Sequence, residues 1–125
     1  MLDQNNPLVT VYIPSHNYGS FLQEAIESVL RQTMDSWELF LLNEGSTDNS
    51  QDIMNLYRGN GKIQIYDTQK IGLPAVANFV LERAKGKYII RLDADDVFDD
   101  NNLLVLSHYL NTHPDIVLVY PDYYL

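Results

Sequence analysis

Leu92-Asp93-Ala94-Asp95-Asp96 is the stretch around which the rest of this sequence is arranged. It follows the apolar run Tyr88-Ile89-Ile90, which we interpret as a buried strand. Carboxylates crowded at the end of a strand repel one another, and a divalent cation that takes oxygen ligands would neutralise them. Ligands of open α/β sheets bind at the carboxyl ends of strands, so the stretch predicts a metal and nucleotide site. The residues also allow an acidic loop before a helix, since Asp99 and Asp100 precede another apolar run.

Apolar runs typical of strands alternate along the chain with apolar stripes typical of helices. We expect strands at 8–13, 37–42, 62–66, 88–90 and 116–120, with helices between them and the strand at 62–66 near an edge of the sheet. Pro14 is expected to end the first strand, Ser20 to cap the first helix and Asp48 to cap the second. This order predicts a mostly parallel sheet in a three-layer α/β/α fold, with residues 1–125 forming one domain.

Polar loops follow the first, second and fourth expected strands, at 15–20, 43–50 and 92–96. Because the carboxyl ends of parallel strands lie on one edge, these remote segments are predicted to share one site. Two common phosphate-binding signatures are absent from the sequence, the Gly-x-Gly-x-x-Gly turn and the Gly-x-x-x-x-Gly-Lys loop. A phosphate group would therefore be held in another way, and Asp93 and Asp95 with a metal ion supply one.

The bulk composition excludes several classes of protein. A formal net charge of −9 with only 8 Lys and Arg residues argues against a nucleic-acid partner. The absence of cysteine excludes disulfides and thiolate metal sites. Residues 1–7 are polar and do not read as a signal peptide, and no apolar run approaches the length of a membrane span. We expect a cytoplasmic protein, or one bound peripherally to the cytoplasmic face of the membrane.

Several motifs occur in an order that is familiar from one enzyme family. They are the strand-one motif Val11-Tyr12-Ile13-Pro14-Ser15-His16-Asn17, the helix at 24–33, the loop Gly45-Ser46-Thr47-Asp48-Asn49-Ser50 and the Asp-x-Asp motif at 92–96. With them the chain resembles the nucleotide-binding half of family-2 inverting glycosyltransferases, which have the GT-A fold. The likeness extends from Leu8 to about Asn102. It implies metal-dependent transfer of a sugar from a nucleoside-diphosphate sugar to an acceptor hydroxyl, with inversion, as in polysaccharide biosynthesis.

The resemblance assigns roles to individual residues. Asp95 would ligate Mn2+ or Mg2+ at the donor's diphosphate, and Asp93 would lie at the donor's ribose or at the metal. Asp96 is expected to begin a helix or to support the ligands from outside. Ala94 belongs to the same donor-binding stretch.

The loops after the first two strands would bind the nucleotide. Pro14 and Ser15 would face the base, His16 would stack on it or lie as a partly exposed loop histidine, and Asn17 would pin the loop. Asn43 and Glu44 stand where the family usually has two aspartates, one of which reads an N–H group of the base. Glu44 is one methylene longer than aspartate, which leaves the identity of the base open.

Other departures concern the phosphates and the chemistry. Ala77 stands where the family often has an arginine facing the phosphates, and Lys70 or Arg91 would have to replace that cation. The family's general base lies downstream of the segment present here, so we expect the chain to bind a donor without transferring its sugar. The acceptor would be a saccharide or a lipid-linked molecule. The sheet edges left open would favour a homodimer.

Two alternatives from other classes remain at this stage. A sugar-1-phosphate nucleotidyltransferase also has an α/β nucleotide domain, but its glycine-rich basic loop after the first strand is absent here. A non-catalytic nucleotide-binding or receiver-like module is the second alternative. A receiver would bind a metal ion but no nucleoside diphosphate, which separates it from a transferase.

Overall fold

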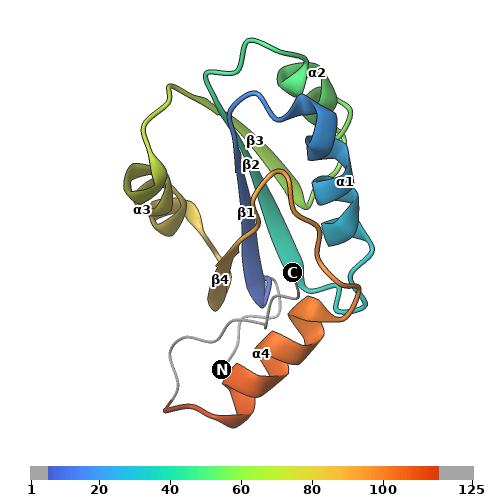
Figure 1. Ribbon diagram of the computed structural model, residues 1–125. Helices are drawn as coiled ribbons and strands as arrows, with labels where there is room; N and C mark the ends of the chain where they lie inside the picture. The colour runs from blue at the N-terminus through green and yellow to red at the C-terminus, as the bar shows by residue number, and fades with distance from the viewer. Residues whose placement is uncertain (1–5, 116–125) are drawn as a thin grey trace.

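The computed structural model describes residues 6–115, in which strands and helices alternate (Figure 1). The elements are β1 (Val9–Ser15), α1 (Gly19–Leu30), β2 (Trp37–Glu44), α2 (Ser50–Asn55), β3 (Ile63–Thr68), α3 (Leu73–Arg83), β4 (Tyr88–Arg91) and α4 (Asn102–Thr112). The strands form one sheet in the order β3-β2-β1-β4, and every pairing is parallel. The predicted parallel sheet is confirmed, with β3 at an edge as expected. The strand expected at 116–120 lies outside the described residues.

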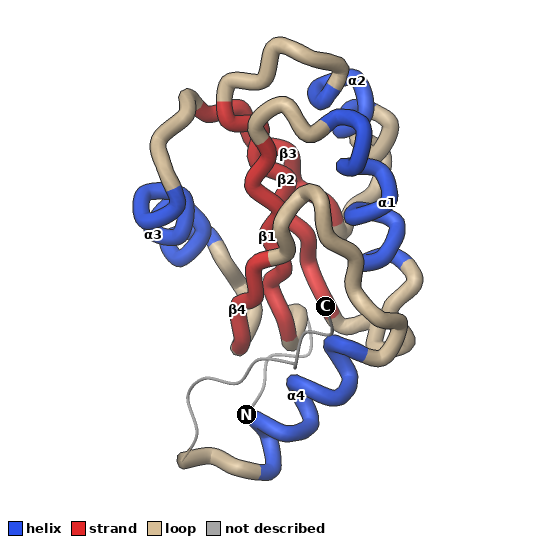
Figure 2. Tube along the Cα trace, viewed as in Figure 1, coloured by secondary structure: helices blue, strands red, loops and turns tan. Residues whose placement is uncertain are grey.

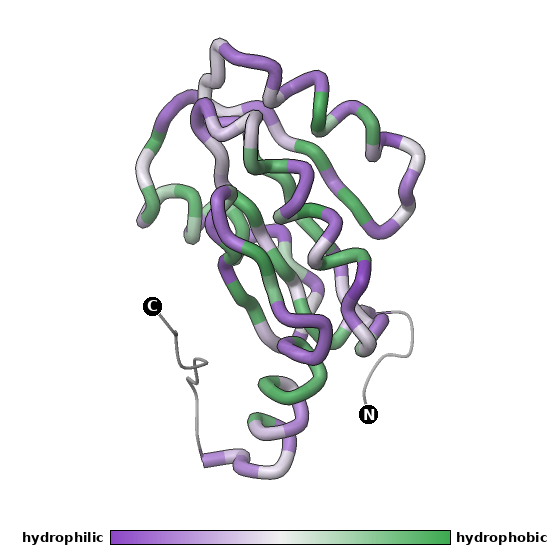
Figure 3. The backbone as a smooth tube through the Cα atoms, turned by 45° about the vertical axis from the view of Figure 1, so that its right-hand side comes forward, coloured by the Kyte–Doolittle hydropathy of each residue, from purple (hydrophilic) through white to green (hydrophobic). Residues whose placement is uncertain are grey.

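The sheet is the middle of three layers, with α1 and α2 over one face and α3 over the other (Figures 1 and 2). The larger core cluster joins the sheet to α1, α2 and α4 and includes Val11, Ile13, Leu22, Ile26 and Met54. The smaller cluster packs Tyr12, Phe40 and Leu42 against Val76 and Val80 of α3. Hydrophobic residues concentrate along the strands, whereas the connecting loops are mostly hydrophilic (Figure 3). The predicted three-layer α/β/α fold is confirmed.

Strand β1 continues through Pro14 to Ser15, so the prediction that Pro14 ends it was wrong. The carbonyl groups of Leu8 and Tyr12 accept hydrogen bonds from the N–H groups of Tyr88 and Leu92, so alternate residues of β1 face β4. Pro14 comes two residues after Tyr12 and has the same orientation. Its missing N–H falls where β4 has already ended, since Arg91 is the last β4 residue in register with β1.

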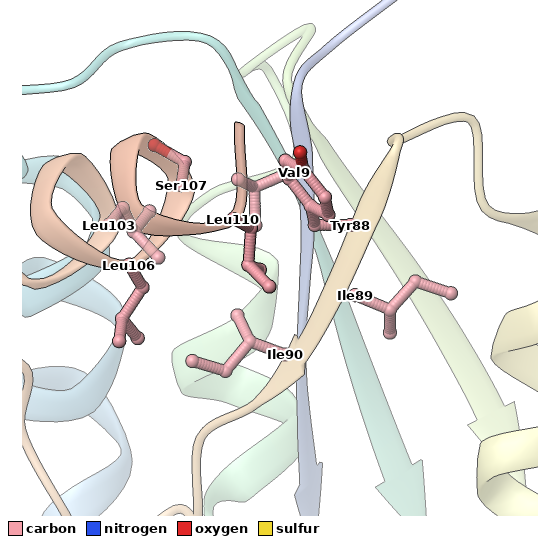
Figure 4. Close-up of a pocket in the computed structure, with 8 residues that line it drawn as sticks. All are labelled: Val9, Tyr88, Ile89, Ile90, Leu103, Leu106, Ser107 and Leu110. Atoms are coloured by element: carbon pink, nitrogen blue, oxygen red, sulfur yellow. The ribbon is translucent and has the colours of Figure 1, made fainter. Parts of the chain in front are cut away.

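Strand β4 is an edge strand within the described residues, and the prediction that it is buried was wrong. Only β1 pairs with it there, and Ile89 and Arg91 are exposed. Ile90 contacts the core, whereas Ile89 points to the opposite side of the strand, away from α4 (Figure 4). The short apolar run therefore predicted the strand correctly, but it did not predict how many other strands pair with it.

Helix α4 packs against β1 and β4 close to the amino ends of these strands. Leu103, Leu106 and Leu110 face Val9 and Ile90 across an apolar gap of about 50 Å³ (Figure 4). A gap of this size has room for only a few water molecules and is too small for a sugar nucleotide. It lies at the end of the sheet opposite to the polar loops. No helix among residues 6–115 has the length and apolar character needed to cross a membrane.

Asp48 connects the beginnings of two helices. Its Oδ2 accepts a hydrogen bond from the N–H of Gly19, the first residue of α1, at 2.9 Å. Its Oδ1 accepts from the N–H of Ser50 at 3.0 Å and from the Ser50 hydroxyl at 2.5 Å. These bonds, with the Ser50 hydroxyl as the largest cause, lower the pKa of Asp48. The prediction that Ser20 caps α1 was wrong. Asp48, from the loop after β2, accepts the hydrogen bond at the start of this helix instead.

Replacing Gly86 with alanine is expected to lower the free energy of unfolding by about 2 kcal/mol, because a methyl group has no room there. It would lie 2.6 Å from Thr10 Oγ1 and 2.8 Å from the carbonyl carbon of Val9. The N–H of Gly86 also donates to Thr10 Oγ1 at 2.9 Å, so the loop cannot withdraw without losing that bond. Urea unfolding measures the change. Gly59→Ala is the control, since nothing lies within 4 Å of its added carbon, and an equal loss in both variants would contradict the expectation.

Candidate functional site

The loops after β1, β2 and β4 meet in one hollow at the carboxyl edge of the sheet, as the sequence predicted. The hollow has a volume of about 280 Å³ and is lined by Pro14, His16, Tyr18, Glu44, Leu73, Asp93, Ala94 and Asp95. The loops after β1 and β2 lie side by side at the top of Figure 1. Because each strand delivers its last residues to the same edge, groups from distant parts of the sequence face one ligand-sized space.

Asp93, Asp95 and Asp96 form the acidic cluster of this site. Each offers one carboxylate oxygen, and these atoms all lie within 4.8 Å of one another. A turn holds them together, since the N–H of Asp96 donates to the carbonyl of Asp93 at 2.9 Å. Burial raises the pKa of Asp96, and the charges of Asp95 and Asp93 raise it further. Oxygen donors at this spacing fit a hard divalent cation, which would relieve the repulsion among them.

One interpretation of the sequence expected Asp96 to begin a helix, and the structure contradicts it. Helix α4 begins at Asn102, several residues further along, and its N-cap residue is Asn101. The carboxylate of Asp96 instead lies with those of Asp93 and Asp95. The sequence prediction placed Asp96 in the acidic stretch but did not count it among the metal ligands.

Glu44 ends β2 with a buried carboxylate in the hollow. Only 7% of the residue is exposed, and its Oε1 atom has no hydrogen-bond partner among residues 6–115. Polar atoms buried in proteins are nearly always paired, so an unpaired carboxylate oxygen on a residue that lines a hollow suits a ligand's hydrogen-bond donor. The Nδ1–H group of His16 donates to the Glu44 backbone carbonyl at 2.7 Å, which fixes the imidazole beside this residue.

Asn43 and Ser15 are adjacent to the hollow but do not line it. The Asn43 side chain accepts from the N–H of Ser46 at 3.1 Å and donates to Gln51 Oε1 at 2.8 Å. Ser15 is buried, and its hydroxyl has no hydrogen-bond partner in the described part of the chain. Asn43 therefore uses these hydrogen bonds to shape its own loop, and its role in binding the donor nucleotide stays a prediction.

Asn17 fastens the first loop to the second, as predicted. Its Oδ1 atom accepts from the N–H of Thr47 at 2.7 Å and from the N–H of Asp48 at 3.3 Å. Its backbone has a φ of 60°, a left-handed conformation that asparagine tolerates better than most residues. The N–H of Asn17 also donates to Ser46 Oγ at 3.0 Å. The loops that carry His16 and Glu44 are thus held together as one unit.

Tyr18 and Leu73 line the hollow, although neither was predicted as a site residue. Tyr18 is 44% exposed and lies within the polar loop after β1. An aromatic residue in a polar loop was the sequence signal that could have predicted it as a site residue. Leu73 is the first residue of α3, the helix that follows β3, and the sequence analysis considered this segment only for a cation at the phosphates. Ala77 lies on the same helix and offers no cation to this edge.

A parallel α/β sheet with acids and a ligand-sized hollow at its carboxyl edge defines a domain of the nucleotide-binding class. The family described as "Glycosyl transferase family 2" matches residues 10–124, and the chain belongs to this family.

Two relatives with known names match most of this chain. The chondroitin synthase of Pasteurella multocida (strain Pm70) is 36% identical over 106 residues, which are 83% of this chain and 11% of that protein. Glycosyltransferase GlyG of Streptococcus pneumoniae serotype 4 is 32% identical over 119 residues, which are 94% of this chain and 39% of that protein. The chain therefore spans between 11% and 39% of the length of these relatives.

Solved structures confirm the fold. The crystal structure of residues 1–349 of Staphylococcus aureus TarS superposes with a TM-score of 0.76 at 22% identity, covering 85% of this chain and 33% of that one. The mannosyltransferase PcManGT of Pyrobaculum calidifontis superposes with a TM-score of 0.69 at 20% identity, covering 81% and 31%. The predicted GT-A fold is confirmed.

Proposed function

We propose that this chain is the donor-binding part of a metal-dependent glycosyltransferase that acts on a nucleoside-diphosphate sugar with inversion. The observation that carries the proposal is the single hollow in which Glu44 and His16 face the acidic cluster. One end of the hollow offers a hydrogen-bond acceptor and a ring for a base, and the other offers carboxylates for a cation at the diphosphate. The structural neighbour TarS was solved in complex with UDP and with UDP-GlcNAc, which supports a donor of this class.

Asp95 and Asp93 would hold the Mn2+ or Mg2+ ion, and Asp96 is close enough to join them. PcManGT, a structural neighbour, was solved with GDP-Man and Mn2+, which supports a divalent metal in this fold. A bound cation would supply charge neutralisation for the nucleoside diphosphate that leaves. The protein's own part is to keep these carboxylates together in the turn between Asp93 and Asp96.

Glu44 and His16 would bind the base, with Pro14 and Ala94 lining the same hollow. A carboxylate accepts hydrogen bonds and donates none, so Glu44 would pair with a ring N–H group. Uracil and guanine carry such a group, whereas adenine and cytosine do not. The orientation of His16 is set by its bond to the Glu44 carbonyl, which presents a flat ring next to the carboxylate.

Transfer also needs a base that deprotonates the acceptor hydroxyl. We propose that this residue comes from a part of the whole protein outside residues 1–125, which agrees with the greater length of the named relatives. The acceptor would be a saccharide or lipid-linked molecule, handled in the cytoplasm or at the cytoplasmic face of a membrane. Both β3 and β4 have an open edge within the described residues, which supports a homodimer formed through the sheet.

Calorimetry with a panel of nucleoside diphosphates, with and without Mn2+, tests the proposed function. We expect UDP or GDP to bind more tightly than ADP and CDP, and to lose most of that affinity when EDTA removes the metal. If a nucleoside diphosphate bound equally well with and without Mn2+, the acidic cluster would not be the site that holds its diphosphate through a metal ion. Binding of Mn2+ alone, with no nucleoside diphosphate accepted, would support the receiver-like alternative instead.

A further inference from the structure

Arg91 is the one described cation held at the acidic cluster. Its Nε atom lies 3.0 Å from Asp93 Oδ1, and it is the last residue of β4. The other ion pairs within residues 6–115, Arg31 with Asp100 and Arg83 with Glu82, do not involve the cluster. Lys62 lies over the Trp37 ring, and Lys87 donates to Asn111 near the amino end of β4. Among the ion pairs of residues 6–115, Arg91 is therefore the cation that contacts a member of the cluster.

Asp93 is shared between two hollows. It lines the donor hollow with Asp95 and also lines a second, more polar hollow of about 150 Å³ with Arg91, Asp96 and Asn102. Arg91 approaches Asp93 from this second side. A metal ion in the donor hollow and the guanidinium of Arg91 would therefore compete for the charge of the same carboxylate.

The ion pair is open to solvent, with 41% of the Arg91 side chain and 49% of the Asp93 side chain exposed. Exposed ion pairs stabilise proteins little, so the cost of breaking this one is small. A guanidinium released from a carboxylate pairs well with phosphate, because its planar N–H groups match two oxygens at once. The arrangement thus suits a side chain that changes partner rather than one that fixes the fold.

We propose that Arg91 couples metal binding to donor binding, by pairing with Asp93 in the free protein and turning to the donor's diphosphate once a cation takes Asp93. This inference rests on the proposed function. It predicts opposite effects of one substitution on two ligands. Without Arg91, the metal alone meets less competition, whereas the anionic donor loses a positive charge.

Arg91→Gln tests the coupling in two titrations. Mn2+ alone, followed by the electron paramagnetic resonance signal of the free ion, should bind about twofold to fivefold more tightly than to the wild-type chain. UDP or GDP, whichever the wild-type chain binds better, should bind about tenfold more weakly at saturating Mn2+. Arg31→Gln is the matched control, since it removes the same charge from an exposed ion pair with Asp100. Both of its affinities should equal those of the wild-type chain.

The outcomes separate this inference from the function on which it rests. A wild-type chain that binds neither Mn2+ nor a nucleoside diphosphate would overturn both. A wild-type chain that binds both, with Arg91→Gln unchanged or weakened toward Mn2+ alone, would overturn only the coupling. Thermal unfolding of both arginine variants near the wild-type temperature would show that the affinities report on folded protein.

Discussion

Replacing Asp95 with asparagine is expected to weaken Mn2+-dependent binding of a nucleoside diphosphate by about 100-fold or more. Residues that merely support metal ligands already change metal affinity by about 10-fold to 100-fold, and a direct ligand should matter at least as much. Asp95 is the carboxylate of the cluster that faces the hollow together with Glu44 and His16. Asparagine keeps the size of the side chain but removes the negative charge that a hard cation requires.

Calorimetry at saturating Mn2+ measures this loss, and resonance spectroscopy of Mn2+ alone shows whether the metal itself is lost. Asp100→Asn is the control, because Asp100 is an exposed carboxylate of the same loop outside the cluster. The free protein should not be destabilised by Asp95→Asn, since the substitution relieves repulsion among three neighbouring acids. Retained affinity in Asp95→Asn would show that the cluster does not hold the metal.

Local sequence patterns predicted the strands well but ended all four described strands too early. Strand β1 runs through Pro14, which was expected to stop it, and β2 includes Asn43 and Glu44, which were assigned to a loop. A prediction based on hydrophobicity assigns polar residues such as Asn43 and Glu44 to a loop, yet both of these β2 residues are buried. At the carboxyl edge of a parallel sheet, the last residues of a strand carry polar side chains for the site while their backbones stay in register with β3.

The contacts that shape the site could not be predicted, because they join residues far apart in the sequence. Asp48 binds the start of α1, and Asn17 binds the loop after β2, each across about 30 positions. Arg91 and Asp93 are different, since residues two apart on an extended chain point to the same side. Their ion pair could have been predicted from this spacing. The sequence analysis instead considered Arg91 only as a replacement for the cation missing at Ala77.

Glu44→Gln is expected to make the free protein more stable and its nucleotide affinity lower. The wild-type carboxylate is 7% exposed with an unpaired Oε1, so it carries the cost of a buried charge without a full set of partners. Removing that charge should raise the free energy of unfolding by about 1 kcal/mol. The same change replaces a charged acceptor for the base by a neutral one, which should weaken UDP or GDP binding by about 10-fold to 100-fold.

The opposite signs of these two effects separate a binding residue from a structural one. If the Glu44 carboxylate only supported the fold, its neutralisation would lower both the free energy of unfolding and the affinity for the nucleotide. Mn2+ binding in the absence of nucleotide should stay unchanged, because Glu44 is not among the acids of the cluster. Glu24→Gln, which removes a charge from an exposed position of α1, should alter none of the three quantities. If Glu44→Gln were less stable than the wild-type chain and still bound the nucleotide fully, Glu44 would be a structural residue and the base would be read elsewhere.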